Sequence, residues 1–292
     1  MIETWPSRAA YMVAMRRAGH QLFDHPKVLD DPLALPILGA GAEDRLRREW
    51  RFASRLGRAV RASMAARSRY AEDQLALAVA RGARQYVVLG AGLDTFAYRN
   101  PYEQAGLRVF EVDHPATQEW KRQRLQAAGI AIPRSATFVP TDFEHQTLAE
   151  ALRAAGFESR QAAFFSWLGV TMYLERETVL NTLRFIASCG SGALGASRAS
   201  GGGVAFDYIV PRESLRWTRR FIFDAMARRV RKAGEPFRTF FEPGELAGEM
   251  TRMGFHATED LGGAEVNARY FSGRTDGLRV PGILGRLISA RV

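Results

Sequence analysis

Short apolar runs alternate with helical segments between residues 85 and 209, and no other feature constrains the fold as strongly. The first run, Gln85–Leu89, is apolar enough for a strand buried on both faces of a sheet. Four more strand candidates follow it: Leu107–Val112, Thr137–Pro140, Ala162–Trp167 and Val204–Ile209. Helices are expected between them, over 115–128, 146–155 and 175–188. This order predicts an α/β fold with a doubly wound, mostly parallel sheet.

The chain before this core has helical character. A first helix is expected over Ala9–Gly19. A long pattern from Asp44 to Ala80 predicts helix with a break near Gly57, and Gly82 is a plausible C-cap.

The chain after the fifth run leaves the strand–helix alternation. The Gly/Ser-rich stretch 190–203 predicts a flexible loop. A basic amphipathic helix is expected over 212–232, followed by a helix at 243–253 and a strand at 255–260.

We therefore predict one domain spanning residues 1–292. It comprises an N-terminal helical segment (1–83), a Rossmann-like core (84–210 and 243–292) and an inserted helical cap (211–242).

A glycine-rich turn, Gly90-Ala91-Gly92-Leu93-Asp94, directly follows the first strand candidate. In doubly wound sheets ligands bind at the carboxyl ends of the strands, and glycines let the backbone approach a ligand closely. Asp113 ends the second strand candidate, 23 residues after Gly90, where a carboxylate can accept hydrogen bonds from ribose hydroxyls. The turn and Asp113 together predict a site for an adenosine-containing cofactor.

Two residues of the turn distinguish between adenosine cofactors. A dinucleotide motif has a third glycine where this chain has Thr95, and Asp94 would place negative charge near a pyrophosphate. S-adenosylmethionine has no phosphate and carries a sulfonium and an ammonium, so the sequence favours it over NAD(H). Its carboxylate needs a cation, for which Arg67 and Arg69 are both candidates.

Charge and composition set the class of protein and the expected partners. The net charge is +10, from 41 basic and 31 acidic residues, which fits either a solvated surface or an anionic partner. One cysteine, Cys189, excludes an intramolecular disulfide and a multi-cysteine metal site. No apolar run reaches the roughly 18 residues of a membrane span, and none resembles a signal peptide. We expect a cytoplasmic protein with no membrane partner and no metal.

Five blocks of sequence resemble the leucine carboxyl methyltransferase family, and in particular its bacterial S-adenosylmethionine-dependent branch. The resemblance runs in order from about residue 7 to residue 282. It is carried by ARSRYAED (66–73), VVLGAGLDTFAYR (87–99), FEVDHP (110–115), WLGVTMYL (167–174) and FDYIVP (206–211). It implies a class I methyltransferase fold and S-adenosyl-L-methionine as cofactor.

The resemblance also implies roles for individual residues. Arg67 is expected to hold the cofactor carboxylate, Gly90 to contact the cofactor and Asp113 to bind its ribose. Asp142 is expected beside the adenine, with Phe143 next to it. The family often has a glutamate that contacts the cofactor where this chain has Leu168, so Asp94 or a backbone carbonyl near Gly90 is the alternative partner for the ammonium.

The methyl acceptor is not specified by any motif. A carboxylate acceptor needs no general base at neutral pH, whereas a hydroxyl acceptor does. The five histidines form no catalytic or metal-binding constellation. His20, Tyr173 and Tyr208 are the candidates for a catalytic role. The aromatic residues of the 212–241 insertion either pack the cap onto the sheet or line an apolar substrate cavity.

Methylation of an oxygen on a small molecule is the main hypothesis for the function. A protein or nucleic-acid methyltransferase, an NAD-dependent oxidoreductase and a non-catalytic cofactor-binding protein are the alternatives. No motif for an extruded base is present, so nucleic acid is not the expected partner. The sequence does not indicate the oligomeric state.

Overall fold

The computed structural model describes residues 7–49, 54–143, 145–189, 201–215, 217–232, 236–281 and 285–292. Within these residues seven strands form one mixed sheet, in the order β3-β2-β1-β4-β5-β7-β6. The strands are β1 (Gln85–Leu89), β2 (Arg108–Asp113), β3 (Ala136–Pro140), β4 (Ala163–Trp167), β5 (Gly203–Ile209), β6 (His256–Leu261) and β7 (Gly285–Arg291).

The pairing of the strands confirms the predicted α/β fold. β2 pairs in parallel with β3, and β4 with β5, whereas β7 runs antiparallel to both β5 and β6. The six predicted strands coincide with β1 to β6 to within one residue at each end. β7 was not predicted from the sequence. The chain order reverses beside β1, so the end of β1 is the place where a doubly wound sheet binds ligands.

The described α-helices are α1 (Arg8–Phe23), α2 (Ala42–Arg48), α4 (Arg55–Ala80), α5 (Pro115–Ala127), α6 (Leu148–Ala154), α7 (Arg176–Ser188), α8 (Trp217–Lys232), α9 (Pro243–Met253) and α10 (Gly263–Tyr270). The predicted break near Gly57 is wrong, because α2 ends at Arg48 and α4 runs through Gly57. A glycine inside a helix costs only about 1 kcal/mol relative to alanine. Residues 190–200 of the predicted Gly/Ser loop lie outside the described residues.

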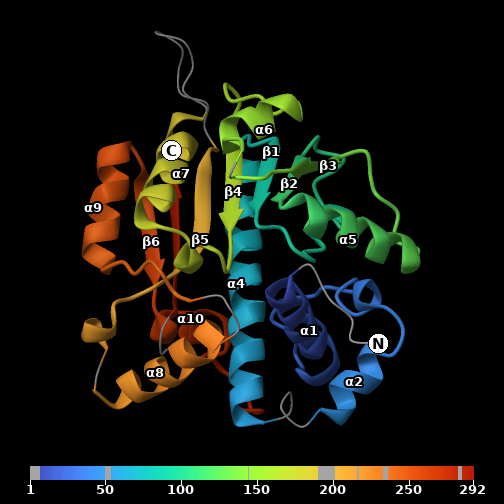
Figure 1. Ribbon diagram of the computed structural model, residues 1–292, viewed down its shortest axis with the longest axis vertical. Helices are drawn as coiled ribbons and strands as arrows, with labels where there is room; N and C mark the ends of the chain where they lie inside the picture. The colour runs from blue at the N-terminus through green and yellow to red at the C-terminus, as the bar shows by residue number, and fades with distance from the viewer. Residues whose placement is uncertain are drawn as a thin grey trace. The chain divides into compact units, whose positions relative to one another are not determined.

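The chain divides into two compact units. The first comprises Met1–Arg69, Val87–Phe157 and Asn267–Pro281. Its apolar core joins α1 and α2 to α5 through buried side chains that include Met15, Leu46 and Leu125. α5 also packs on β3, at the edge of the sheet (Figure 1).

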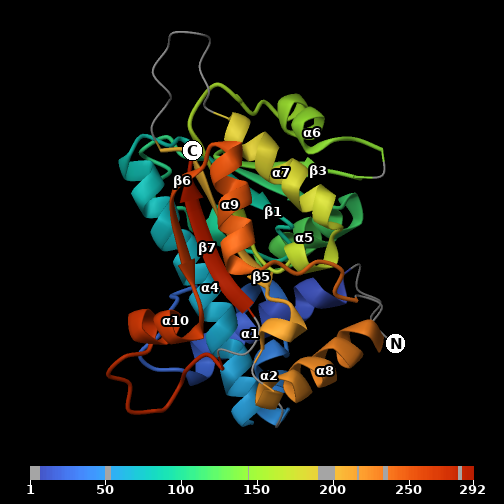
Figure 2. The ribbon, with the colours of Figure 1, turned by 90° about the vertical axis from the view of Figure 1, so that its left-hand side faces the viewer.

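The second unit comprises Tyr70–Tyr86, Glu158–Val266 and Gly282–Val292. In this unit α7 packs on β5 and α9 on β6, and the two helices lie side by side (Figure 2). The inserted helix α8 contributes Phe223 to a small core with Met172 and Ile209. On the same helix Trp217 is 71% exposed and Phe221 is 69% exposed. The aromatic residues of the insertion therefore divide between packing and an exposed face.

Candidate cofactor site

The glycine-rich turn leaves β1 and folds back onto the end of β2. The main-chain N–H groups of Gly90 and Ala91 both donate hydrogen bonds to the Val112 carbonyl oxygen, at 2.9 and 3.1 Å. Gly90 has φ +68° and Gly92 has φ +46°, a region that favours glycine. A Cβ atom on Gly92 would lie 3.1 Å from the Ala10 Cβ, so α1 passes directly over the turn.

Asp113 is brought to this turn, as the sequence predicts. Its Oδ2 accepts a hydrogen bond from the Gly92 N–H at 2.6 Å, and its Oδ1 accepts one from the His114 N–H at 2.7 Å. The side chain is half-buried. A carboxylate offers about four acceptor positions, so two remain for other donors. The arrangement suits a ligand with neighbouring hydroxyl groups.

The segment after β3 meets the same edge of the sheet. The Thr141 N–H donates to the Asp113 carbonyl oxygen at 2.9 Å, which places Asp142 and Phe143 one and two residues further along. Phe143 is 63% exposed. Asp142 lies within 3.0 Å of the His145 Nδ1. An exposed aromatic ring next to Asp142 in the chain suits stacking on a flat heteroaromatic ring.

Asp94 is held by the protein itself. Its Oδ2 accepts from Arg17 at 2.7 Å and its Oδ1 accepts from the Phe96 N–H at 2.8 Å. Burial would raise the pKa of Asp94, but the charges of Arg17, Lys121 and Arg99 hold that pKa below its ordinary value. The charge of Asp94 is therefore already paired with the Arg17 guanidinium, which makes it a weaker partner for a ligand ammonium than the sequence suggests.

Arg17 organises a buried cluster that the sequence did not indicate. Besides Asp94, it donates to Asp31 at 2.5 Å and to the Thr95 hydroxyl at 3.0 Å. The Thr95 hydroxyl in turn donates to Asp31 at 2.7 Å. Thr95 therefore helps to connect α1 to the turn. It stands at the position of the third glycine in a dinucleotide motif.

Two arginines of α4 are candidates to bind the cofactor carboxylate, and they differ in burial. Arg67 is buried, with 9% of its surface exposed, whereas Arg69 is exposed and reaches the Val28 carbonyl oxygen at 3.4 Å. Residues two apart on a helix point to different faces. Arg67 is the one that faces the interior.

A buried ion pair supports β2 two residues before Asp113. The Lys121 Nζ donates to Glu111 Oε1 at 2.7 Å, and the Tyr98 hydroxyl donates to Glu111 Oε2 at 2.7 Å. Burial raises the pKa of Glu111, although Lys121 and Tyr98 act in the opposite direction. This pair ties β2 to α5 beneath the end of the strand.

His20 has no ring nitrogen left for a substrate. It is completely buried, its Nδ1 lies 3.0 Å from Asp24 Oδ2, and its Nε2 accepts from the N–H groups of Val28 and Leu29. Asp24 also pairs with Arg61 at 2.7 Å. Burial would raise the pKa of Asp24, but its bonds to His20 and Arg61 lower it overall. This geometry favours a structural role for His20.

The two candidate tyrosines lie in the second unit. Tyr208 is 1% exposed and donates its hydroxyl hydrogen to Asp260 at 2.6 Å. Its burial, reinforced by Asp260, raises the pKa of the phenol far above its ordinary value. Tyr173 packs against Phe237, with ring centroids 5.8 Å apart. Neither of these contacts would activate the tyrosine as a general base.

Leu168, where the family often has a glutamate, follows β4. The turn that begins there is fixed by Asp207, which accepts from the Gly169 N–H at 2.5 Å, while the Thr171 hydroxyl donates to the Asp207 carbonyl oxygen at 2.6 Å. This role of Asp207 was not predicted from the sequence. Across the described residues, no three His, Cys, Asp or Glu side chains are grouped as a metal site would require.

No described helix combines the length and the apolar character that a membrane crossing requires.

Comparison with known proteins gives a consistent result. Residues 10–187, more than half of the chain, match the sequence model of the family described as leucine carboxyl methyltransferase. A Bacillus subtilis protein described as a "Putative S-adenosyl-L-methionine-dependent methyltransferase" is 35% identical over 216 residues, which cover 73% of this chain and 67% of that protein. A Mycobacterium marinum protein with the same description is 36% identical, over 56% of each chain.

Solved structures agree on the fold. A DUF574 family protein from Streptomyces avermitilis aligns with a TM-score of 0.58 and 16% identity, over 96% of both chains. A protein described as a "putative methyltransferase" from Thermobifida fusca aligns with a TM-score of 0.56 and 16% identity, over 99% of both chains. At this identity the likeness concerns the fold alone.

Proposed function

We propose that this chain, which belongs to the leucine carboxyl methyltransferase family and is an S-adenosylmethionine-dependent methyltransferase, methylates an oxygen atom of a small molecule. A carboxylate is the acceptor that the side chains favour. The observation that carries the proposal is the hydrogen bond between Gly92 and Asp113, because it joins the glycine turn to the acidic residue in one site.

The residues of the first unit fit the parts of this cofactor. The free acceptor positions of Asp113 suit the two ribose hydroxyls, and the backbone of Gly90, Ala91 and Gly92 lies beside that carboxylate. Asp142 and the exposed Phe143 are proposed to flank the adenine. Arg67 is proposed to hold the carboxylate, since a guanidinium binds a carboxylate through two parallel hydrogen bonds.

The amino group of the cofactor needs a partner other than the side chain at position 168, because Leu168 cannot accept a hydrogen bond through its side chain. The charge of Asp94 is already paired with that of Arg17. Backbone carbonyl groups near Gly90 are therefore our proposed partners for the ammonium.

The bound cofactor supplies a methyl group on a positively charged sulfur. In the transfer the acceptor oxygen forms a bond to the methyl carbon while the sulfur–carbon bond breaks, and the sulfur keeps the electron pair. The protein has to align the acceptor and exclude water. A carboxylate acceptor is already ionised at neutral pH, so no proton has to be removed.

The state of the candidate bases supports a carboxylate over a hydroxyl. His20 uses both ring nitrogens inside the protein, and the phenol of Tyr208 is bonded to Asp260. A hydroxyl acceptor would need a base with a free acceptor atom. Neither of these two residues offers one.

The proposal is tested by incubating the purified protein with methyl-labelled S-adenosylmethionine and an extract of the producing organism. We expect label in a small molecule, released as methanol by mild alkali because the product is a methyl ester. If the labelled small molecule is stable to alkali, the acceptor is not a carboxylate but another group. Label that remains in protein or nucleic acid would overturn the proposal of a small-molecule substrate.

A further inference from the structure

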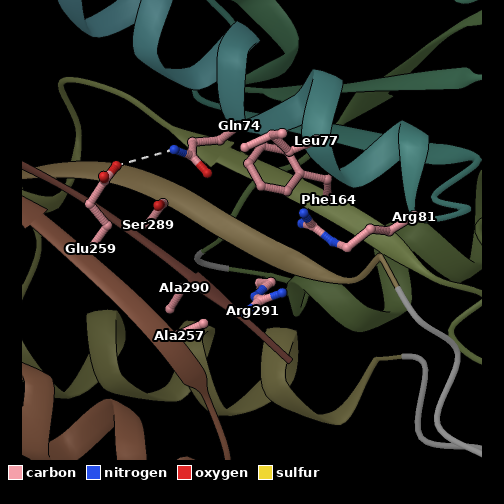
Figure 3. A pocket seen from close by; sticks show the side chains of 9 residues that line it. All are labelled: Gln74, Leu77, Arg81, Phe164, Ala257, Glu259, Ser289, Ala290 and Arg291. Atoms are coloured by element: carbon pink, nitrogen blue, oxygen red, sulfur yellow. Dashed lines mark hydrogen bonds between the residues drawn. The ribbon is translucent and has the colours of Figure 1, made fainter. Parts of the chain in front are cut away.

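A second candidate binding site lies in the second unit and shares no residue with the cofactor turn. It is a cavity of about 280 Å³ between α4 and strands β4, β6 and β7 (Figure 3). This volume is slightly below the roughly 300 Å³ at which the range for small-molecule sites begins, so the cavity suits a small ligand. The lining combines charged and polar side chains with the apolar Leu77, which is 52% exposed.

The polar groups at one end of the cavity are ordered by contacts with α4. Gln74 donates to Glu259 Oε2 at 3.2 Å, as the dashed line in Figure 3 shows. Tyr70, one turn earlier on α4, donates its hydroxyl hydrogen to Ser289 at 2.8 Å. The Glu259 carboxylate and the Ser289 hydroxyl are therefore held in place.

Two arginines line the rest of the cavity. Arg81 directly follows the last residue of α4, and Arg291 is the last residue of β7 (Figure 3). Burial lowers the pKa of Arg81, and the nearby charge of Arg291 lowers it further. Two guanidinium groups that repel each other across a cavity lose that repulsion when an anion binds between them.

The wall formed by β6 is irregular at this point. The pairing of β6 with β7 shifts register between His256 and Glu259, and Ala257 has φ +47°. A residue with a Cβ rarely adopts this conformation, and such bulges are frequent beside binding sites. The bulged Ala257 is itself part of the lining.

We propose that this cavity binds a small organic anion whose carboxylate or phosphate group lies between Arg81 and Arg291. Its body rests against Leu77 and Ala257, and its hydroxyl or amino groups face Glu259 and Ser289. The site is distinct from the proposed cofactor site, because its lining includes neither the glycine turn nor Asp113 nor Arg67.

The test is calorimetric titration of the full chain with citrate and, separately, with inorganic phosphate, at constant ionic strength. We expect saturable binding of at least one anion, and the stronger ligand identifies the carboxylate or the phosphate as the preferred group. Arg291→Gln and Arg81→Gln should each weaken this binding roughly tenfold, the usual loss with a charged hydrogen-bond partner.

Arg160→Gln is the matched control, because Arg160 is an exposed arginine of the same unit outside the cavity. The affinity of the Arg160→Gln variant for the anion should equal that of the unchanged protein. Arg291 is exposed near the chain end, so its variant reports on binding even if Arg81→Gln folds poorly. No saturable binding of either anion, or equal binding by Arg291→Gln and Arg160→Gln, would overturn the proposal.

Discussion

The Gly92 N–H donates a hydrogen bond of 2.6 Å to Asp113 Oδ2, so the turn after β1 and the end of β2 are held together. The sequence places these residues 21 positions apart, and the parallel sheet brings them into contact. Because Asp113 retains acceptor capacity, the same carboxylate can order the turn and bind ribose hydroxyls. The predictions below separate these two roles.

Gly92→Ala should damage both the turn and cofactor binding. The φ of +46° costs a residue with a Cβ about 1 kcal/mol, and the new Cβ would press on Ala10 at 3.1 Å. We expect a loss of about 1–2 kcal/mol in the free energy of unfolding, together with weaker binding of S-adenosylhomocysteine. Urea unfolding and calorimetry measure the two effects.

Gly41→Ala provides the control for backbone strain. Gly41 has φ +78° and no atom within 4 Å of the new Cβ. This variant should lose stability to a similar degree and bind the cofactor product normally. Normal binding by Gly92→Ala would mean that the turn does not contact the ligand.

Arg67→Gln should weaken binding of S-adenosylhomocysteine roughly tenfold or more, because the ligand carboxylate loses its cation. Binding of 5′-methylthioadenosine, which lacks the amino-acid part, should change little. Arg69→Gln, an exposed neighbour on the same helix, should affect neither ligand. If Arg67→Gln weakens both ligands equally, Arg67 supports the fold rather than the carboxylate.

His20→Ala should lower stability and leave the chemistry of the folded protein intact. The change removes one of the two partners of the Asp24 carboxylate and the acceptor of the buried Val28 N–H, at a cost of about 2–4 kcal/mol. The turnover number, measured on the folded fraction once the acceptor is known, should be near normal. A stable variant with no turnover would instead identify His20 as a catalytic residue.

Lys121→Met should be strongly destabilising, because it leaves Glu111 buried without its cation. Breaking a buried pair from one side costs about 3–5 kcal/mol. Burial raises the folded-state pKa of Glu111 above its ordinary value of 4.5, so the folded protein binds this proton more tightly than the unfolded chain does. Stability therefore falls as pH rises through that pKa, and the deficit should be largest at neutral pH and smallest near pH 4.5.

Adding Glu111→Gln to Lys121→Met removes the buried charge and should recover part of the loss. Urea unfolding of both variants at neutral and acidic pH measures this. A deficit that does not depend on pH would contradict the assignment of the loss to Glu111.

A strand that is buried on both faces of the sheet could be predicted from the sequence. Gln85–Leu89 is buried at every position, and such a strand is recognisable as a continuous apolar run. Gly285–Arg291 has exposed residues at both ends and pairs with β5 and β6, which are distant in sequence. Its strand conformation depends on those neighbours, so local pattern did not predict it.

The candidate site was predictable where a functional residue directly follows a strand. Asp113 could be identified in this way, and the structure brings it to Gly92. Arg17 could not, because its partners Asp31 and Asp94 lie 14 and 77 residues away. The one available sign was that Arg17 falls on the apolar face of its helix, three residues after the buried Ala14.

The central claim is that Asp113 binds the ribose of S-adenosylmethionine. Calorimetric titration of Asp113→Asn with S-adenosylhomocysteine and with 5′-methylthioadenosine tests it most directly, since both ligands contain the ribose. The control is Asp30→Asn, because that side chain is 77% exposed and pairs only with Lys27 in the described residues. We predict affinities reduced roughly tenfold to a hundredfold for both ligands in the folded Asp113 variant and unchanged in the control. Unchanged affinity of a folded Asp113→Asn protein for both ligands would contradict the account.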